Sequence, residues 1–323
     1  MLNASVIIPI YNGIEDLPDL LACLKAQTYP GSQVEYLLVD NNSTDHTFDQ
    51  LQAASQDFAQ QGLTLRPLQE PKIQSSYAAR NKGICAAQSE LLAFTDADCR
   101  PQPTWLENLL KPFSQANIGL AVGEILALPS ENLLEQYAER KDTLSQKHTL
   151  NHSFCPYGQT ANLAIRKQAL RDVGLFRPYL TTGGDADICW RILRETDWQL
   201  EFVEDAVVRH RHRASLVELR SQWRRYGRSN RYLHDLHGVA LGTEINPQKT
   251  VYRLSRWLLK ELPIATLKLV VGKAKTVDLM NTPLDLITFH ARSRGQQQAV
   301  LPDAAREIQP FPELQSDSPS INP

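Results

Sequence analysis

Short apolar segments rich in β-branched residues alternate with helical patterns over the first hundred residues. Residues 4–10, 35–40, 63–68 and 91–96 fit buried strands, and residues 17–24 and 76–88 fit helices. This alternation is typical of an α/β fold. Open α/β sheets bind ligands beyond the carboxyl ends of their strands, so the polar residues that follow these segments are the first candidates for a functional site.

The pattern becomes mixed after residue 100. We expect helices over 105–113, 131–147, 187–195 and 216–236, and extended segments over 119–128 and 160–165. Ser43 or Thr44 is expected to cap the helix that follows the second strand. The 323 residues, 42% of them hydrophobic, are enough for one large α/β domain with an appendage or for two modest domains.

Composition narrows the class of protein. The formal net charge of −2 gives no support for nucleic-acid binding. Five cysteines without a CxxC pair argue against a disulfide framework or a zinc ribbon and favour a reducing cytosol. The first residues lack the features of a secretory signal, and no apolar run reaches the roughly 18 residues of a membrane span. We therefore expect a cytoplasmic protein that binds no nucleic acid.

Two aspartates stand two residues apart at the end of the fourth predicted strand. In extended backbone such side chains share a face, so Asp96 and Asp98 are expected to converge on one site. Carboxylate oxygens suit Mg²⁺ or Mn²⁺, which proteins hold with one or two carboxylates and substrate phosphates. Taken alone, the pair fits a solvated loop equally well.

Five motifs surround this pair in a set order. They are VIIPIYN at 6–12, VDNNSTD at 39–45, ARNKG at 79–83, TDAD at 95–98 and GGDADICWR at 183–191. The set resembles the family 2 glycosyltransferases, inverting enzymes with the GT-A fold, over about residues 4–230. The resemblance implies an α/β nucleotide-sugar-binding sheet flanked by helices.

The resemblance also implies a donor site. It places the nucleotide base beside Pro9, Tyr11, Asn12 and Asp40, and base or phosphate beside Arg80 and Lys82. For Arg80 and Lys82 an exposed helix start is the alternative reading. Asp96 would contact the ribose or the metal.

The resemblance assigns metal binding and catalysis to other residues of the same motifs or near them. Asp98 would bind Mg²⁺ or Mn²⁺ directly, and His210 stands where many relatives supply a further ligand. Asp185 is the candidate general base, with Asp187 as its competitor. Relatives usually have Glu before this aspartate, whereas this chain has Gly184, and Asp187 is alternatively the cap of the helix at 188–195.

Three residues are further candidates for contact with the donor sugar or the acceptor. They are Asn162, Asp187 and Arg225, the last from a basic run at 209–231 whose arginines recur at helical spacing. A solvated charged face is the alternative reading of such a run.

The chain divides into a catalytic domain at 1–235, a helical extension at 236–300 and a tail at 301–323. The tail is rich in Pro, Ser and Gln and is expected to be disordered. Residues 253–275 combine apolar side chains with a cationic fringe. This pattern fits peripheral contact with the inner face of a membrane, or packing against the catalytic domain.

These expectations converge on inverting transfer of a sugar from a nucleoside-diphosphate-sugar to a glycan or lipid-linked acceptor, in surface polysaccharide or glycolipid synthesis. A sugar nucleotidyltransferase would carry a cationic, glycine-rich loop after the first strand, where this chain offers only Gly13. A catalytically inactive nucleotide- or glycan-binding relative is the other alternative. The presence of Asp96, Asp98 and Asp185 argues against it.

Overall fold

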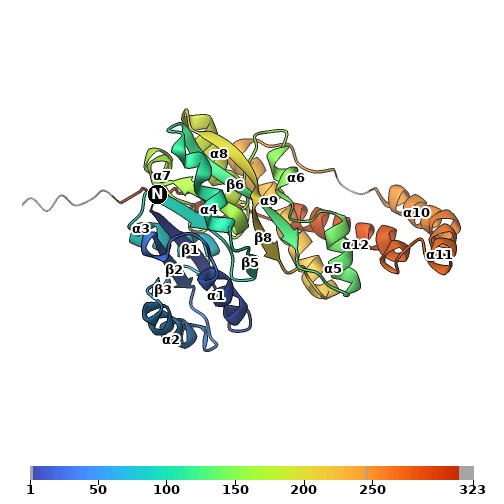
Figure 1. Ribbon diagram of the computed structural model, residues 1–323. Helices are drawn as coiled ribbons and strands as arrows, with labels where there is room; N and C mark the ends of the chain where they lie inside the picture. Colours follow the sequence, from blue (N-terminus) through green and yellow to red (C-terminus); the bar gives the residue numbers. More distant parts are fainter. Residues whose placement is uncertain (1–2, 244–245, 313–323) are drawn as a thin grey trace, which may run out of the picture.

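The protein has the expected α/β fold, which is built on a mixed sheet of eight strands (Figure 1). The computed structural model describes residues 3–243 and 246–312. The strand order is β3-β2-β1-β4-β7-β6-β8-β5. The strands are β1 (Ala4–Ile10), β2 (Val34–Asp40), β3 (Thr64–Gln69), β4 (Leu91–Phe94), β5 (Cys99–Pro101), β6 (Ile118–Ala127), β7 (Leu163–Arg166) and β8 (Gln199–His210).

Helices cover both faces of the sheet. They are α1 (Leu17–Lys25), α2 (Thr47–Gln60), α3 (Ser76–Ala86), α4 (Trp105–Leu110), α5 (Leu133–Arg140), α6 (Gln146–Leu150), α7 (Lys167–Val173), α8 (Gly184–Glu195), α9 (Leu216–His237), α10 (Pro247–Arg256), α11 (Leu262–Val270) and α12 (Val277–Gln298). Successive strand residues point to opposite faces. Val6 and Ile8 therefore pack with α1, α2 and α4, while Ile7 packs with α3, α7 and α8.

The parallel half of the sheet follows the predicted pattern. β1 pairs in parallel with both β2 and β4, and the register sets Ile10 opposite Asp40. The second half is antiparallel at β4–β7, β7–β6 and β8–β5. The long strand β8 had no prediction, although it lies beside β6 at the centre of this half.

Several local predictions were wrong for identifiable reasons. The single helix expected over 131–147 is divided into α5 and α6, because Asp142 adopts a left-handed φ of 48° and Ser145 caps a new helix. Helix α2 begins at Thr47, whose amide donates to Asp45. Ser43 therefore caps no helix and instead accepts from the Asn12 amide. The strand expected over 160–165 begins at Leu163, after a 3₁₀ turn.

The expected tail at 301–323 begins as ordered structure. Leu301 and Ala305 are buried in the core that α7 and α8 share. The Gln309 carbonyl accepts from the Leu175 amide at 2.8 Å, and its side chain accepts from Asn81 at 3.0 Å. The expectation of disorder was therefore wrong for 301–312, and residues 313–323 lie outside the described residues.

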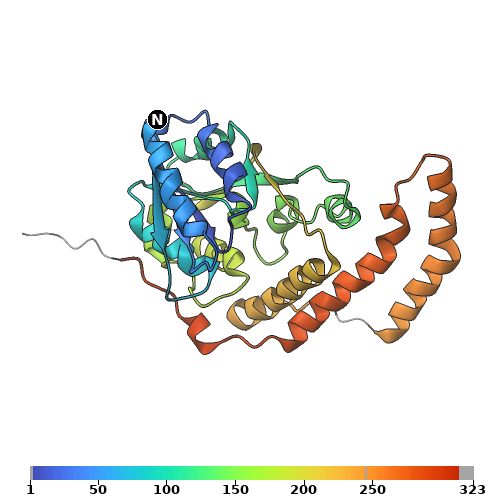
Figure 2. The same cartoon turned by 90° about the horizontal axis from the view of Figure 1, so that it is seen from below.

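Helices α10, α11 and α12 come after α9 in the chain. Helix α9 continues to His237, so the expected boundary at residue 235 falls inside it. Helix α12 runs beside α9, and α10 and α11 stand out at one end of the molecule (Figure 2). Among the described residues, no helix combines the length and the hydropathy needed to span a membrane.

Two glycines allow α9 and α12 to approach closely. A β carbon on Gly227 would lie 1.9 Å from the Arg292 carbonyl oxygen, and one on Gly295 would lie 2.0 Å from the Arg224 carbonyl oxygen. Both obstacles are backbone atoms, which cannot rotate away. The helix pair therefore requires glycine at both positions.

Gly227→Ala is accordingly expected to lower the free energy of unfolding by about 1–3 kcal/mol, the usual cost of overpacking. Thermal unfolding followed by circular dichroism measures the change. Gly242→Ala is the control, because its nearest non-neighbouring atoms would lie at 3.4 and 3.5 Å. Equal stability of the two variants would contradict the close-packing argument.

Candidate functional site

A cleft of about 480 Å³ opens beyond the ends of β1 and β4, a size typical of small-molecule sites. Helices α8 and α9 form its opposite wall. Nine of the residues singled out from the sequence line it. They are Pro9, Tyr11, Asn12, Arg80, Asp96, Asp98, Asp185, His210 and Arg225.

The loop after β1 is held by the loop after β2. Asn12 adopts a left-handed φ of 47°, which asparagine tolerates better than most residues. Its side-chain oxygen accepts from the Thr44 amide at 2.8 Å, and its own amide donates to Ser43 at 2.8 Å. The Asn12 side chain therefore shapes this edge of the cleft, and Tyr11 is exposed beside it.

Arg80 and Asp96 form an ion pair inside the cleft. The Arg80 guanidinium lies 2.6 Å from an Asp96 carboxylate oxygen, and the arginine is almost fully buried. Its Nε is buried without a hydrogen-bond partner among the described residues. Arg80 thus belongs to the cleft wall. The alternative interpretation, in which Arg80 is an exposed residue at the start of a helix, is wrong.

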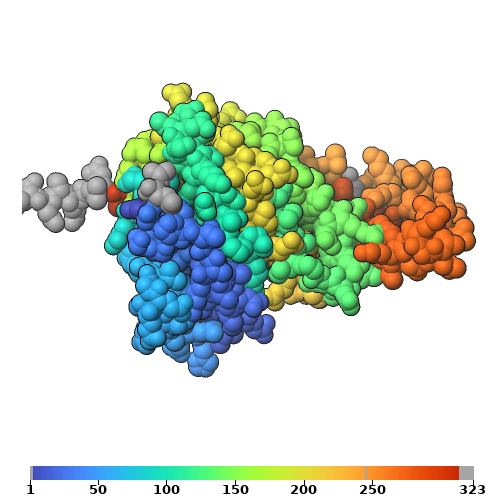
Figure 3. All heavy atoms as spheres, in the orientation of Figure 1, coloured from blue at the N-terminus to red at the C-terminus, as the bar shows by residue number. Residues whose placement is uncertain are grey.

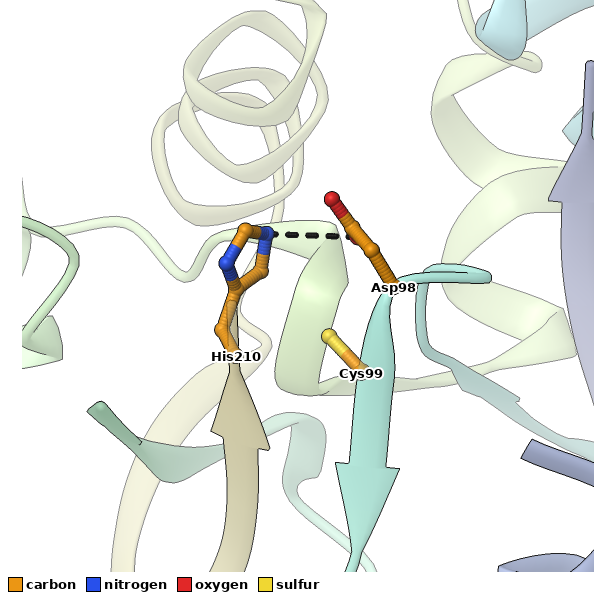
Figure 4. A group of neighbouring side chains, drawn as sticks. All are labelled: Asp98, Cys99 and His210. Atoms are coloured by element: carbon orange, nitrogen blue, oxygen red, sulfur yellow. Dashed lines mark ion pairs between the residues drawn. The ribbon is translucent and has the colours of Figure 1, made fainter. Parts of the chain in front are cut away.

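Asp98 and His210 point toward each other from the ends of two antiparallel strands (Figure 4). His210 Nε2 lies 3.2 Å from Asp98 Oδ1, and Arg213 lies 3.7 Å from Asp98 Oδ2. Although burial opposes ionisation, these cationic neighbours lower the pKa of Asp98. The carboxylate is thus held in its charged, metal-binding form.

The donor set at this point fits a hard divalent cation. Carboxylate oxygen is the ligand that Mg²⁺ and Mn²⁺ prefer, and an imidazole nitrogen is a ligand for several divalent transition metals. The Cys99 sulfur belongs to the same group, but burial raises the pKa of its thiol and keeps it protonated. Asp98, and His210 in its neutral form, are therefore the residues that fit a metal here, because metal binding displaces the imidazole proton.

Asp185 lies in the first turn of α8. Gly183 precedes the helix with a φ of 82°, and Thr160 donates a hydrogen bond to Asp185 Oδ1 at 3.0 Å. Burial raises the pKa of Asp185. A carboxylate with a raised pKa at the edge of a cleft is suited to accept a proton.

The glycine before Asp185 has a structural explanation. A β carbon on Gly184 would lie 2.7 Å from Tyr77 Cζ, so the Tyr77 ring fills the space beside this position. The Gly184 amide also donates to the Tyr77 hydroxyl at 3.0 Å. Tyr77 stacks on Phe176 and has little room to move. In this chain Tyr77 therefore takes the place beside α8 that a longer side chain at 184 would need.

Asp187 does not face the cleft and does not cap α8. It is fully buried, and its carboxylate lies 2.9–3.1 Å from Arg177, Arg191 and His237. Burial opposes ionisation, but these groups lower its pKa to about 2. Helix α8 begins three residues before Asp187, which places this side chain in the interior.

Three further candidates lie away from the cleft lining. Asn162 is fully buried and bonds to Trp105 and to the carbonyls of Glu124 and Ala206, so it joins core elements. Asp40 is 1% exposed and accepts from the Ser43 amide. Lys82 lies on the exposed side of α3.

Other lining residues were not singled out from the sequence. They are chiefly Tyr77, Tyr157, Thr160, Arg213 and Tyr226. Thr160 stands two residues before the candidate Asn162, and Arg213 lies within the basic run at 209–231. For Tyr77 and Tyr157 no sequence motif pointed to the cleft.

Comparison with known proteins identifies the family of the chain. The sequence model described as "Glycosyl transferase family 2" matches residues 5–174, and that of "Glycosyl transferase family group 2" matches residues 91–275. The chain is 31% identical over 258 residues to glycosyltransferase AglE of Haloferax volcanii, and the match covers 79% of each protein.

Two more similarities extend the comparison. The pre-mycofactocin glycosyltransferase of Mycobacterium tuberculosis is 29% identical over 232 residues, which are 70% of this chain and 46% of that protein. The match therefore spans less than half of that relative. The structure of mannosyltransferase PcManGT from Pyrobaculum calidifontis, in complex with GDP-Man and Mn²⁺, superimposes with a TM-score of 0.59. That alignment has 16% identity and covers 92% of this chain and 87% of the other.

The fold and these similarities define a glycosyltransferase with a GT-A-like fold. The chain belongs to glycosyl transferase family 2, as the resemblance predicted.

The Tyr77–Gly184 contact can be tested by a double-mutant cycle. Gly184→Ala is expected to lower the free energy of unfolding by about 1–3 kcal/mol, because the added methyl group meets a ring that is held in place. In a Tyr77→Leu background the same change is expected to cost at least about 1 kcal/mol less. Urea unfolding measures all four proteins, and equal costs in both backgrounds would contradict the contact.

Proposed function

We propose that this protein is a metal-dependent, inverting glycosyltransferase that uses a nucleoside-diphosphate-sugar. The observation that carries the proposal is the shared cleft of Asp98, His210 and Asp185. It combines an ionised metal-binding carboxylate with a second carboxylate whose pKa is raised. The acceptor is a glycan or a lipid-linked glycan, in surface polysaccharide or glycolipid synthesis.

The donor nucleotide is assigned to the β1 side of the cleft. Pro9, Tyr11 and Asn12 line this side, and Asp96 and Arg80 lie at the adjoining strand end. Asp40 stays beside this region, in register with the last residue of β1. Lys82 and Asn162 take no part in the proposed site, because they lie outside the cleft.

Asp98 and His210 would hold Mg²⁺ or Mn²⁺. When bound, the cation neutralises negative charge on the departing diphosphate. Arg213 and Arg225 add positive charge to the same cleft from the start and middle of the α9 region. Arg225 makes no ion pair with any of the described residues and can contact a phosphate or an acceptor group.

Asp185 is proposed as the general base. The acceptor hydroxyl oxygen attacks the anomeric carbon from the side opposite the diphosphate, and its proton passes to the Asp185 carboxylate. Attack from that side inverts the anomeric configuration. Thr160 orients the carboxylate by donating to Oδ1. Asp187 is unsuited to this role, because its carboxylate is fully buried and is engaged by Arg177, Arg191 and His237.

Ligand-induced stabilisation tests the donor and metal sites. We expect one member of a panel of UDP, GDP, dTDP and CMP to raise the melting temperature strongly with Mn²⁺ and weakly without it, because bound ligand stabilises the folded state. Asp98→Ala is expected to remove the Mn²⁺ dependence. Asp197→Ala, at an exposed position in the α8–β8 loop, serves as control. A nucleotide shift unaffected by Mn²⁺ would contradict the metal assignment.

Replacement of the proposed general base, Asp185, separates the chemical step from donor binding. Asp185→Asn is expected to reduce the transfer rate by at least about a hundredfold, the lower range for a lost general base, while nucleotide binding persists. In the unmodified enzyme the rate should fall as pH drops through the raised Asp185 pKa, above the ordinary value of 3.8, because only the ionised form accepts a proton. Near-normal turnover by Asp185→Asn would refute the assignment.

A catalytically inactive binding relative makes a different prediction. Such a protein would bind one nucleotide of the panel and turn over no nucleotide-sugar with any acceptor.

The proposed location is cytoplasmic, at the inner face of the membrane, with contact through residues 253–275.

A further inference from the structure

The segment between α9 and α12 forms a projecting helical arm. Helix α10, a π-helical turn at Trp257–Glu261 and helix α11 follow one another without a break from Pro247 to Val270. Figures 2 and 3 show this arm standing out from the body of the molecule. Its contacts with α12 are few and specific. Trp257 donates to the Leu279 carbonyl at 2.9 Å, and Thr282 donates to Glu261 at 2.6 Å.

The side of the arm turned away from α12 is apolar and exposed. No residue of α10, the π turn or α11 is buried. Large apolar side chains are exposed along the whole arm. They are Val251, Tyr252, Leu258, Leu259, Ile264, Leu267, Val270 and Val271, whereas Leu254 lines a pocket with Pro283 and Leu286 of α12. Val251 and Tyr252 lie before the segment that the sequence marked, whereas Trp257 faces α12 instead.

The π turn brings the apolar residues of the two helices onto one face. Successive residues of an α-helix advance by about 100°, and the extra residue of a π turn sets the following helix back by about that angle. With this shift, Leu267 and Val270 continue the stripe that Val251 and Leu259 begin. Without it, Leu267 would lie above Lys249, on the side of the charged residues.

The charges of the arm lie along one border of that stripe. On the same helical projection Lys249, Arg256, Lys260 and Lys268 fall together beside the apolar face. Residues 247–275 contain seven Lys or Arg and a single acid, Glu261. Glu261 is already engaged by Thr282 and by Arg256 at 2.9 Å. Arg253 pairs with Asp285 of α12, but Lys249, Lys260 and Lys268 form no ion pair with any of the described residues. The exposed face therefore offers apolar area together with the positive charge of these three lysines.

We propose that this arm docks the enzyme on the surface of an anionic lipid bilayer, with its axis in the plane of the headgroups. An apolar stripe with a cationic border is the surface that interfacial helices present to such lipids. A second copy of the chain fits less well, because pairing two such faces would bring like charges together. The proposal specifies the membrane contact included in the proposed function and deepens the assignment of a lipid-linked acceptor.

Vesicle sedimentation of the full chain tests the docking surface. The probe is vesicles of phosphatidylglycerol and phosphatidylcholine in equal parts, compared with phosphatidylcholine alone, at about 0.01 M and about 1 M salt. We expect binding to the anionic vesicles that weakens with salt. Leu259→Glu with Val270→Glu is expected to lower the partition coefficient roughly tenfold or more, because both side chains would leave the apolar phase.

A matched control carries the same charges elsewhere. Val217→Glu with Val300→Glu changes two side chains that are 78% and 80% exposed, against 78% and 79% for Leu259 and Val270. The control is expected to bind vesicles like the unmodified chain. Equal binding by both double variants, or no binding to anionic vesicles at low salt, would overturn the proposal.

Sedimentation velocity without lipid tests whether a second copy of the chain binds the apolar face instead of a membrane. A concentration-dependent dimer that the Leu259→Glu, Val270→Glu variant abolishes would also overturn the proposal in favour of self-association. Vesicle binding requires neither donor nor turnover. Its failure therefore leaves the proposed chemistry untouched, and failure of transfer leaves the docking result untouched.

Discussion

The candidate site depends above all on the antiparallel pairing of β5 with β8. This pairing sets Cys99 opposite His210 and so brings Asp98 beside an imidazole that lies more than a hundred residues later. The Arg213 side chain enters the same region just after β8 ends. Without this short ladder Asp98 would lose its neighbours His210 and Arg213.

Sequence reasoning succeeded where local patterns and chain order suffice. The parallel strands, the helices after them and the polar residues at their ends follow from periodicity and turn chemistry, and they place Tyr11, Asn12 and Asp96 correctly in one cleft. The family followed from motif order, and Asp98 and His210 proved to be neighbours. These predictions required no knowledge of distant packing.

Sequence reasoning failed where contacts between distant parts of the chain decide the environment of a side chain. Asp185 and Asp187 look alike in the sequence, yet one faces Thr160 in the cleft and the other is enclosed by Arg177, Arg191 and His237. The polarity of 301–312 suggested disorder because composition does not show that Leu301 and Ala305 are buried in the core with α7 and α8. Strand β8 was missed because its alternation is interrupted by acidic residues.

The segment at 301–312 has a consequence for the way the protein unfolds. The Gln309 side chain accepts from Asn81, and the Arg306 carbonyl accepts from Arg177, which itself pairs with Asp187. Asn81 and Arg177 thus bond to residues that lie 228 and 129 positions later in the chain. Detachment of this segment would remove hydrogen-bond partners from the interior. The segment and the sheet are therefore expected to unfold together, as one cooperative unit.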